Sequence, residues 1–260
     1  MLVNIKEKRY GKTLSLKDIH IDFPKGKTSL IIGTSGAGKS TLIKCLIHET
    51  SFLGKITEKG LSEKELLKKI AYIPQHPALN KNETVEESIY WTSRFSFLFA
   101  KKDELLYKTD ECIDQVGLTH VKESKIKNLS GGQMQRVAIA KELIRDKEII
   151  IADEIDTGLD CGVARSLSEM LQKIAHEQGK TVIIISHNLT NVTLYDQIVV
   201  LVRDSKKVGR VAYCGSPFYA KQFFNVSDYV DILTLVNRTD EGGLGKADMY
   251  IDKFSSEKQQ

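Results

Sequence analysis

The chain has 260 residues, of which 41% are hydrophobic, and its net charge of +4 is spread over interspersed charges of both signs. This length supports one large domain, with or without an inserted lobe, and so mild a charge predicts no nucleic-acid partner. The four cysteines are widely spaced, which argues against a disulfide framework. The N-terminus lacks the apolar core of a secretory signal. The longest apolar runs are far shorter than the ~20 residues of a membrane helix, so no membrane span is expected.

Residues 1–32 have β character. Residues 14–23 alternate apolar and polar side chains, as a half-exposed strand does, whereas residues 29–33 form the continuous apolar run of a strand buried on both faces. After Gly38, the apolar residues Leu42, Ile43 and Leu46 are spaced as on one face of a helix. We therefore predict strands within residues 1–32, followed by a helix.

Residues 62–147 are mostly helical in pattern. The pairs Ser62 with Glu65 and Thr84 with Glu87 have the spacing of capping boxes, which open helices. Another helix is predicted up to Gly117, and a further one over residues 133–144. We interpret residues 75–145 as a helical lobe inserted into a sheet.

Short β-branched runs return at residues 148–154 and 181–186, and an amphipathic helix separates them and ends at Gly179. Buried strands that alternate with helices indicate an α/β fold with a mainly parallel sheet. Residues 198–202 and 210–215 are predicted to form a late hairpin. We expect one domain over residues 1–240 and a polar tail over residues 241–260.

Glycines are concentrated in "LIIGTSGAGKST", residues 30–41. The pattern G-x-x-x-x-G-K-[ST] is matched by Gly33, Gly38, Lys39 and Ser40 and is typical of a phosphate-binding loop. Glycines let backbone N–H groups surround phosphates, lysine reaches the β- and γ-phosphates, and the serine hydroxyl binds Mg²⁺. A chance glycine-rich turn is the alternative, but a strand before and a helix after argue against it. The predicted nucleotide contacts are Gly33, Thr34, Ser35, Gly36, Ala37, Gly38, Lys39, Ser40 and Thr41.

Two further segments carry polar groups suited to a nucleotide. The stretch "LSGGQ" opens a helix, so that it offers a second anion site, and "IIIADE" ends a buried strand with Asp153 and Glu154. Neighbouring strand residues point to opposite sides, so we expect different tasks: a water-mediated Mg²⁺ contact for Asp153 and general-base catalysis for Glu154. The predicted contacts of the second anion site are Ser130, Gly131, Gly132 and Gln133.

Gln75 and His187 each follow a short apolar run that reads as a strand. Ligands of open α/β sheets collect at the carboxyl edge of the strands. We therefore expect both side chains to converge with Glu154 near the γ-phosphate, as catalytic groups.

Taken together, the segments resemble the nucleotide-binding domain of ATP-binding cassette (ABC) proteins. The order matches the family: the phosphate loop at 33–40, the Q-loop glutamine Gln75, the signature at 129–133, Asp153 with Glu154, a D-loop at 157–160, and the switch histidine His187. The resemblance covers residues 1–190 and implies the P-loop NTPase fold of ABC ATPases, with an N-terminal antiparallel β subdomain.

The resemblance also implies a mechanism. Two copies, identical or related, face each other head to tail, and each of two ATP molecules lies between the phosphate loop of one copy and the signature of the other, with Asp160 near the opposing phosphate loop. Mg²⁺ would be held by Ser40, Gln75 and Asp153, while Gln75 would also couple the site to transmembrane permease subunits. Tyr10 corresponds in position to the aromatic residue that stacks on adenine. The chain would act at the cytoplasmic face of a membrane.

Each assignment has a structural alternative. Tyr10 could instead be an ordinary aromatic residue of a strand, and His187 a histidine at a strand end with a backbone partner. Glu154 could be a solvated acid or a helix-cap partner, and Gln75 a surface glutamine. Trp91 and the aromatic run at 94–99 fit a docking surface for a membrane helix or the core of the helical lobe, and we interpret them as core.

The family usually continues D-E-P-T where this chain has Ile155 and Asp156 after Glu154. The D-loop "TGLD" and residues 209–224 resemble the G subfamily, which are exporters, so the sequence favours export. We therefore expect a transporter ATPase with separate membrane chains. A soluble ABC scaffold or remodelling factor is the alternative, and the intact Glu154 and His187 argue against a binding module with incidental hydrolysis.

Overall fold

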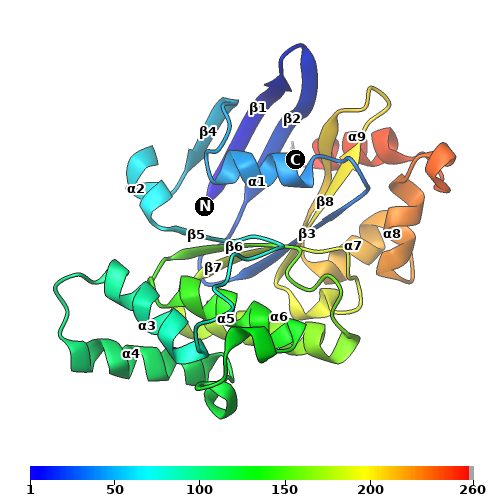
Figure 1. Cartoon of the computed structure of the whole chain (residues 1–260). Helices are drawn as coiled ribbons and strands as arrows, with labels where there is room; N and C mark the ends of the chain where they lie inside the picture. The colour runs from blue at the N-terminus through cyan, green and yellow to red at the C-terminus, as the bar shows by residue number, and fades with distance from the viewer. Residues whose placement is uncertain (258–260) are drawn as a thin grey trace.

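The computed structural model describes residues 1–257, and one nine-stranded mixed sheet runs through it in the order β4-β1-β2-β9-β8-β3-β7-β6-β5 (Figure 1). The strands are β1 (Leu2–Tyr10), β2 (Thr13–Asp22), β3 (Thr28–Gly33), β4 (Leu53–Thr57), β5 (Ile70–Ile73), β6 (Ile149–Asp153), β7 (Thr181–Ile185), β8 (Gln197–Arg203) and β9 (Gly209–Gly215).

The helices cover both faces and one end of this sheet (Figure 1). They are α1 (Lys39–Leu46), α2 (Glu63–Lys68), α3 (Val85–Ser96), α4 (Lys102–Gln115), α5 (Gly131–Leu143), α6 (Cys161–Gln178), α7 (Pro217–Phe224), α8 (Tyr229–Val236) and α9 (Ala247–Glu257), with short 3₁₀ turns at 119–121, 126–128, 192–194 and 239–241.

The N-terminal strands form the predicted antiparallel unit. β1 pairs antiparallel with β2 and β4, and this unit joins the rest of the sheet through one parallel pair between β2 and β9, Leu16 with Gly209. A Cβ atom at Gly209 would lie 2.2 Å from the Ala37 carbonyl oxygen. Glycine therefore lets this junction approach the phosphate loop closely.

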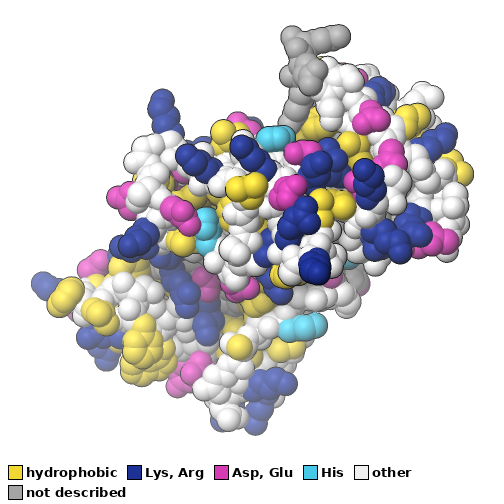
Figure 2. Space-filling view, turned by 90° about the horizontal axis from the view of Figure 1, so that it is seen from above, with side chains coloured by type: hydrophobic (Ala, Val, Ile, Leu, Met, Phe, Trp, Pro, Cys, Tyr) yellow, Lys and Arg dark blue, Asp and Glu magenta, His cyan; other side chains and the backbone are white. Residues whose placement is uncertain are grey.

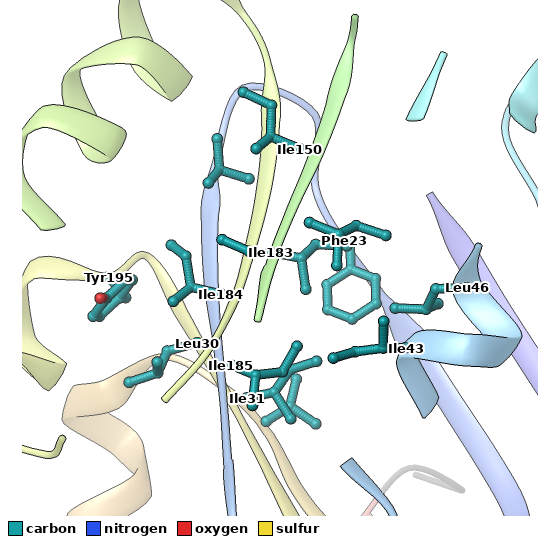
Figure 3. Packing of buried hydrophobic residues seen from close by; sticks show 14 of the residues in the cluster. Phe23, Leu30, Ile31, Ile43, Leu46, Ile150, Ile183, Ile184, Ile185 and Tyr195 are labelled. Atoms are coloured by element: carbon teal, nitrogen blue, oxygen red, sulfur yellow. The ribbon is translucent and has the colours of Figure 1, made fainter. Parts of the chain in front are cut away.

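The parallel centre of the sheet carries the core. All six residues of β3 and all five of β7 are buried, because helices lie on both sides of these strands. Figure 3 shows the alternation: Leu30 and Ile184 point toward Tyr195, whereas Ile31 and Ile185 point toward Ile43 of α1. The buried face of α1 thus anchors the helix that follows the phosphate loop.

Both expected capping boxes are present, one at the start of α2 and one at the start of α3, the first helix of the lobe. At the start of α2, the Ser62 side chain accepts from the Glu65 backbone N–H, and the Glu65 carboxylate accepts from the Ser62 backbone N–H. Thr84 and Glu87 form the same pair of hydrogen bonds at the start of α3. Helices α3, α4 and α5 pack against one another, and α5 also contacts β5, so the lobe is attached at the β5 side of the sheet (Figure 1).

The interpretation of the aromatic run as lobe core is wrong. The side chains of Phe95 and Phe99 are 74% and 101% exposed, and Trp91 is 49% exposed. The buried face of α3 is formed instead by Val85, Ser88, Ile89, Thr92 and Ser93. Because the helix turns these residues inward, Trp91 and Phe95 stand on its outer face, and Phe99 lies beyond its C-terminal end.

The C-terminal segment also differs from the expected polar tail. Strands β8 and β9 form the predicted antiparallel hairpin, and α9, within residues 241–260, packs on β9. The Tyr250 hydroxyl donates to the Phe224 carbonyl oxygen at 3.1 Å, and the Phe223 and Phe254 rings lie 6.3 Å apart. The buried residues of α9 are Ala247, Tyr250, Ile251 and Phe254, a helical spacing that the glycine- and charge-rich composition of the segment conceals.

No helix within residues 1–257 combines the length and the apolarity that a membrane crossing requires. All four cysteines are free thiols.

A carboxylate at the start of β8 ties β3 and α6 together. The backbone N–H of Thr28 donates to Asp196 Oδ2 at 2.9 Å, His176 Nε2 lies 2.8 Å from the same oxygen, and Lys27 Nζ donates to Oδ1 at 3.0 Å. Burial alone would raise the pKa of Asp196, but these hydrogen bonds outweigh it and lower the pKa to about 2.

We expect Asp196→Asn to lower the free energy of unfolding at pH 7 by about 1–3 kcal/mol, since charged hydrogen bonds to Asp196 are lost. Because the folded-state pKa is depressed, this stabilisation is present above the ordinary pKa of aspartate and disappears as pH falls from about 4 to about 2. Urea unfolding at pH 7 and pH 2.5 measures it, with exposed Asp252→Asn as the control. A difference between wild type and Asp196→Asn as large at pH 2.5 as at pH 7 would contradict the assignment.

Candidate nucleotide-binding site

The loop between β3 and α1 has the backbone geometry of a phosphate cradle. Gly38 has φ 94° and Gly36 has φ 68°, conformations that L side chains rarely adopt. Gly33 pairs with Leu201 of β8, and a Cβ atom there would lie 2.1 Å from the Leu201 carbonyl oxygen. Glycine is thus required at the first position by close approach and at the others by backbone conformation.

A cavity of about 370 Å³ opens at the N-terminal end of α1. Backbone N–H groups at this end of a helix are free to bind an anion, and the helix dipole favours negative charge there. Gly33 and Thr34 lie beside this cavity and supply carbonyl groups that bind Lys39. The cavity is lined by Ser15, Ser35, Gly36, Ala37, Gly38, Lys39, Ser40, Thr41, Glu154 and His187.

Lys39 is held in place by the loop. Its Nζ donates to the carbonyl oxygens of Gly33 at 2.9 Å and Thr34 at 3.1 Å, and the residue is only 8% exposed. Burial lowers the pKa of Lys39, while the nearby carboxylates of Glu154 and Asp153 oppose this change. The site therefore presents a cation that is fixed in position and poorly hydrated, which suits binding of a polyphosphate.

Glu154 connects the two other predicted catalytic residues. Gln75 Nε2 donates to Glu154 Oε2 at 3.0 Å, and His187 Nε2 lies 2.9 Å from Glu154 Oε1. The three residues come from segments after β5, β6 and β7, whose parallel pairing brings their carboxyl ends to one edge. The structure thus brings the three side chains together, and it places the Glu154 carboxylate between an amide donor and an imidazole.

Asp153 has different partners from Glu154. Tyr72 Oη donates to Asp153 Oδ2 at 3.3 Å; burial raises the pKa of Asp153, and this hydrogen bond opposes the rise. We expected the two side chains on opposite sides of one strand, but that alternation does not apply, because β6 ends at Asp153 and Glu154 has φ 46°. Both carboxylates raise the pKa of Lys39. The two carboxylates still differ in their hydrogen-bond partners.

The predicted signature and D-loop residues lie elsewhere on this chain. Ser130 and Gln133 form a capping box at the start of α5, and Asp160 accepts a hydrogen bond from the Val163 backbone N–H at 2.9 Å at the start of α6. Ser130, Gly131 and Asp160 are exposed, Gly132 is buried, and none of them lines the phosphate cavity. One chain therefore brings together only part of the predicted site.

Residues 16–157 match the family model described as ABC transporter. The chain belongs to the ABC transporter family. As an ATP-binding domain of this family, it is an ATP-hydrolysing enzyme.

The relatives extend over most of this ABC chain. A methionine import ATP-binding protein from Haemophilus ducreyi is 32% identical over 237 residues, which are 86% of this chain and 68% of the relative. A phosphonates import ATP-binding protein from Synechococcus is 34% identical over 81% of this chain and 82% of the relative. The solved structure of cbiO1 from Clostridium perfringens, part of the ABC transporter complex cbiONQ, is 25% identical, with TM-score 0.75 over 86% of this chain and 90% of that one. The ABC ATPase fold is thus confirmed.

The relatives correct one expectation. The likeness to the G subfamily of exporters is not supported, because the related ATP-binding proteins are named as import proteins. The "TGLD" variant of the D-loop and the segment after His187 were too short to decide the direction of transport.

Tyr10 is exposed but lies outside the phosphate cavity. It ends β1, is 47% exposed, and has Lys8 Nζ above its ring at 4.2 Å from the centroid. Adenine stacking by Tyr10 stays a prediction.

Three residues of the site escaped sequence analysis. Ser15 lines the cavity and donates to Thr41 Oγ1 at 3.3 Å, Tyr72 binds Asp153, and Gln135 Nε2 of α5 donates to the Gln75 carbonyl oxygen at 3.3 Å. Only Tyr72 has a readable signal, since it lies on the strand that pairs with the one ending at Asp153. The other two contacts join segments that no local pattern connects.

Proposed function

We propose that this chain is the ATP-hydrolysing subunit of an importer, working as a head-to-tail dimer at the cytoplasmic face of a membrane. The carboxylate of Glu154, held between Gln75 and His187 at the mouth of the phosphate cavity, is the observation that carries the proposal. A general base must accept a proton from the attacking water, and Glu154 offers a carboxylate for this beside the fixed ammonium of Lys39. Import is supported by the names of the relatives.

The residues present fit a magnesium ion. Ser40 lines the phosphate cavity, and the carboxylate of Asp153 is partly buried near Lys39 with a raised pKa, so it would gain from a nearby cation. Hydroxyl and carboxylate oxygens are the ligands that Mg²⁺ prefers beside phosphates. Bound there, Mg²⁺ would neutralise phosphate charge, with Ser40 and Asp153 as ligands; Gln75, whose amide nitrogen donates to Glu154, would contribute its oxygen.

A second copy would complete the site. Ser130 and Gly131 at the start of α5 are exposed and do not line the phosphate cavity of their own chain. The α5 N-terminus offers an anion site to another molecule. We infer that ATP joins the phosphate loop of one copy to the signature of the other, with Asp160 close to the opposing loop.

A groove beside α3 and α5 fits a membrane partner. Two adjoining cavities share Lys141 and Arg145; one is bounded by the segment after β5, and the other contains Phe95 and Lys147. Other aromatic side chains of the helical lobe are also exposed. Figure 2 shows hydrophobic side chains gathered at the end of the molecule where α3 and α4 lie in Figure 1. We propose that the groove receives a cytoplasmic segment of a transmembrane subunit with apolar and acidic side chains, since the groove offers aromatic and basic ones.

The partner proposal predicts the outcome of affinity purification from membranes. Tagged wild-type protein is expected to bring down a multi-span membrane protein, and the double variant Phe95→Ser, Phe99→Ser should reduce its recovery about tenfold or more, because exposed aromatic anchors dominate such interfaces.

The matched control is Phe218→Ser, a comparably exposed residue on α7, which should leave recovery unaffected. ATP binding by the double variant should be retained, since neither phenylalanine lines the phosphate cavity. Absence of a multi-span partner for the wild type would favour the alternative, a soluble ABC scaffold.

A further inference from the structure

The loop that follows Glu154 carries a carboxylate where the usual family pattern D-E-P-T has threonine. This residue, Asp156, is partly buried and comes three residues after the end of β6. The loop folds through two backbone turns, from Thr157 N–H to the Glu154 carbonyl at 3.2 Å and from Leu159 N–H to the Asp156 carbonyl at 3.3 Å. Asp156 therefore lies between the general base and the D-loop.

The Asp156 side chain binds the residue before the switch histidine. Ser186 Oγ donates to Asp156 Oδ2 at 2.5 Å, and the same Ser186 oxygen accepts the backbone N–H of Asn188 at 2.8 Å. Ser186 is only 1% exposed, so water does not compete for its hydroxyl. One buried hydroxyl thus connects both neighbours of His187 to the loop after Glu154.

The direction of these hydrogen bonds depends on Asp156. A serine hydroxyl has one proton, and an acceptor at position 156 fixes where that proton points. The lone pairs of the oxygen are then left for the Asn188 N–H. Without that acceptor, the hydroxyl is free to rotate, and the turn that carries His187 loses its side-chain tie to the loop after Glu154.

The position of His187 depends on this turn. Its side chain is 53% exposed, so packing constrains it little, and its contact with Glu154 Oε1 at 2.9 Å requires a well-placed backbone. We propose that Asp156 is a positioning residue for ATP hydrolysis, which holds the Ser186–Asn188 turn so that His187 contacts Glu154. This inference rests on the proposed role of Glu154 in hydrolysis.

The positioning of His187 depends on a hydrogen-bond acceptor at position 156 rather than on its negative charge. Burial raises the pKa of Asp156, and the hydrogen bond from Ser186 opposes that rise. A neutral side chain of the same shape with an acceptor oxygen is therefore expected to serve, which makes asparagine the conservative variant.

The test is steady-state ATP hydrolysis by Asp156→Ala, Asp156→Asn and Ser186→Ala, with equilibrium ATP binding and thermal unfolding of each. Asp156→Ala and Ser186→Ala should lower kcat about tenfold or more with KM changed less than about threefold, since a small displacement of a catalytic group is costly. Asp156→Asn should retain a kcat at least about fivefold above that of Asp156→Ala.

Two controls separate positioning from loss of stability. Ser168→Ala removes another buried serine, whose hydroxyl lies 2.9 Å from the Tyr195 hydroxyl, and should lower the unfolding temperature without lowering kcat. In a His187→Ala background, Asp156→Ala should lower kcat by less than about twofold further, because coupled residues are non-additive.

A kcat of Asp156→Ala equal to wild type, an Asp156→Asn variant as slow as Asp156→Ala, or additive losses with His187→Ala would each overturn the positioning role. Absence of hydrolysis by the wild-type chain would instead contradict the proposed function itself, so the two failures are distinguishable.

Discussion

Replacing Glu154 by glutamine is expected to reduce ATP turnover by about 100-fold or more, the usual contribution of a general base. Glutamine has nearly the shape of glutamate but cannot accept a proton from water. Its amide can still contact Gln75 and His187, which lie 3.0 Å and 2.9 Å from the two carboxylate oxygens. We therefore expect the site to stay assembled while hydrolysis fails.

The same variant should bind ATP with nearly wild-type affinity and accumulate as an ATP-bound dimer, because ATP is no longer consumed. Initial rates of phosphate release measure the first effect, and size-exclusion chromatography with Mg²⁺ and ATP measures the second. Glu177→Gln, on an exposed position of α6, is the matched control. Hydrolysis by Glu154→Gln at the wild-type rate would remove the general-base assignment.

Replacing Lys39 by methionine should weaken ATP binding by about 30- to 1000-fold, equivalent to about 2–4 kcal/mol of lost charged hydrogen bonding. The Lys39 ammonium is held by the Gly33 and Thr34 carbonyls and is almost completely buried. Its orientation therefore costs little when phosphate binds, which makes its contribution large. Methionine keeps an unbranched side chain and removes the ammonium group, with its charge and its hydrogen-bond donors.

Isothermal titration with ATP and Mg²⁺ measures the loss of affinity. Lys44→Met is the matched control, since Lys44 is exposed on the same helix α1 and does not line the cavity. Unfolding temperatures of both variants without nucleotide should be similar to each other. Equal ATP affinities for Lys39→Met and Lys44→Met would show that the cavity is not the phosphate site.

Sequence patterns predicted the local chemistry of this ABC protein well. The glycines of the phosphate loop, the capping boxes at Ser62 and Thr84 and the buried run of β3 depend on backbone conformation and on neighbours close in the chain. Such features are encoded within a few residues and can be read from them.

The errors arose where burial depends on distant neighbours. The outer face of α3 carries Trp91 and Phe95, although their aromatic character suggested core. Conversely, Tyr250 and Phe254 are buried in a segment whose composition suggested a tail, because β9 and α7 provide an apolar surface for α9.

By itself, the sequence predicted that this chain binds a nucleoside triphosphate, and it determined which residues form the glycine-rich loop and which polar side chains follow the strands. Only the tertiary structure decided that Gln75 and His187 bind opposite oxygens of Glu154, and that Asp156 reaches Ser186. The reason is geometric: these contacts join residues 30 to 79 positions apart, in segments that follow parallel strands. Their formation depends on the register and backbone angles that only the folded sheet sets.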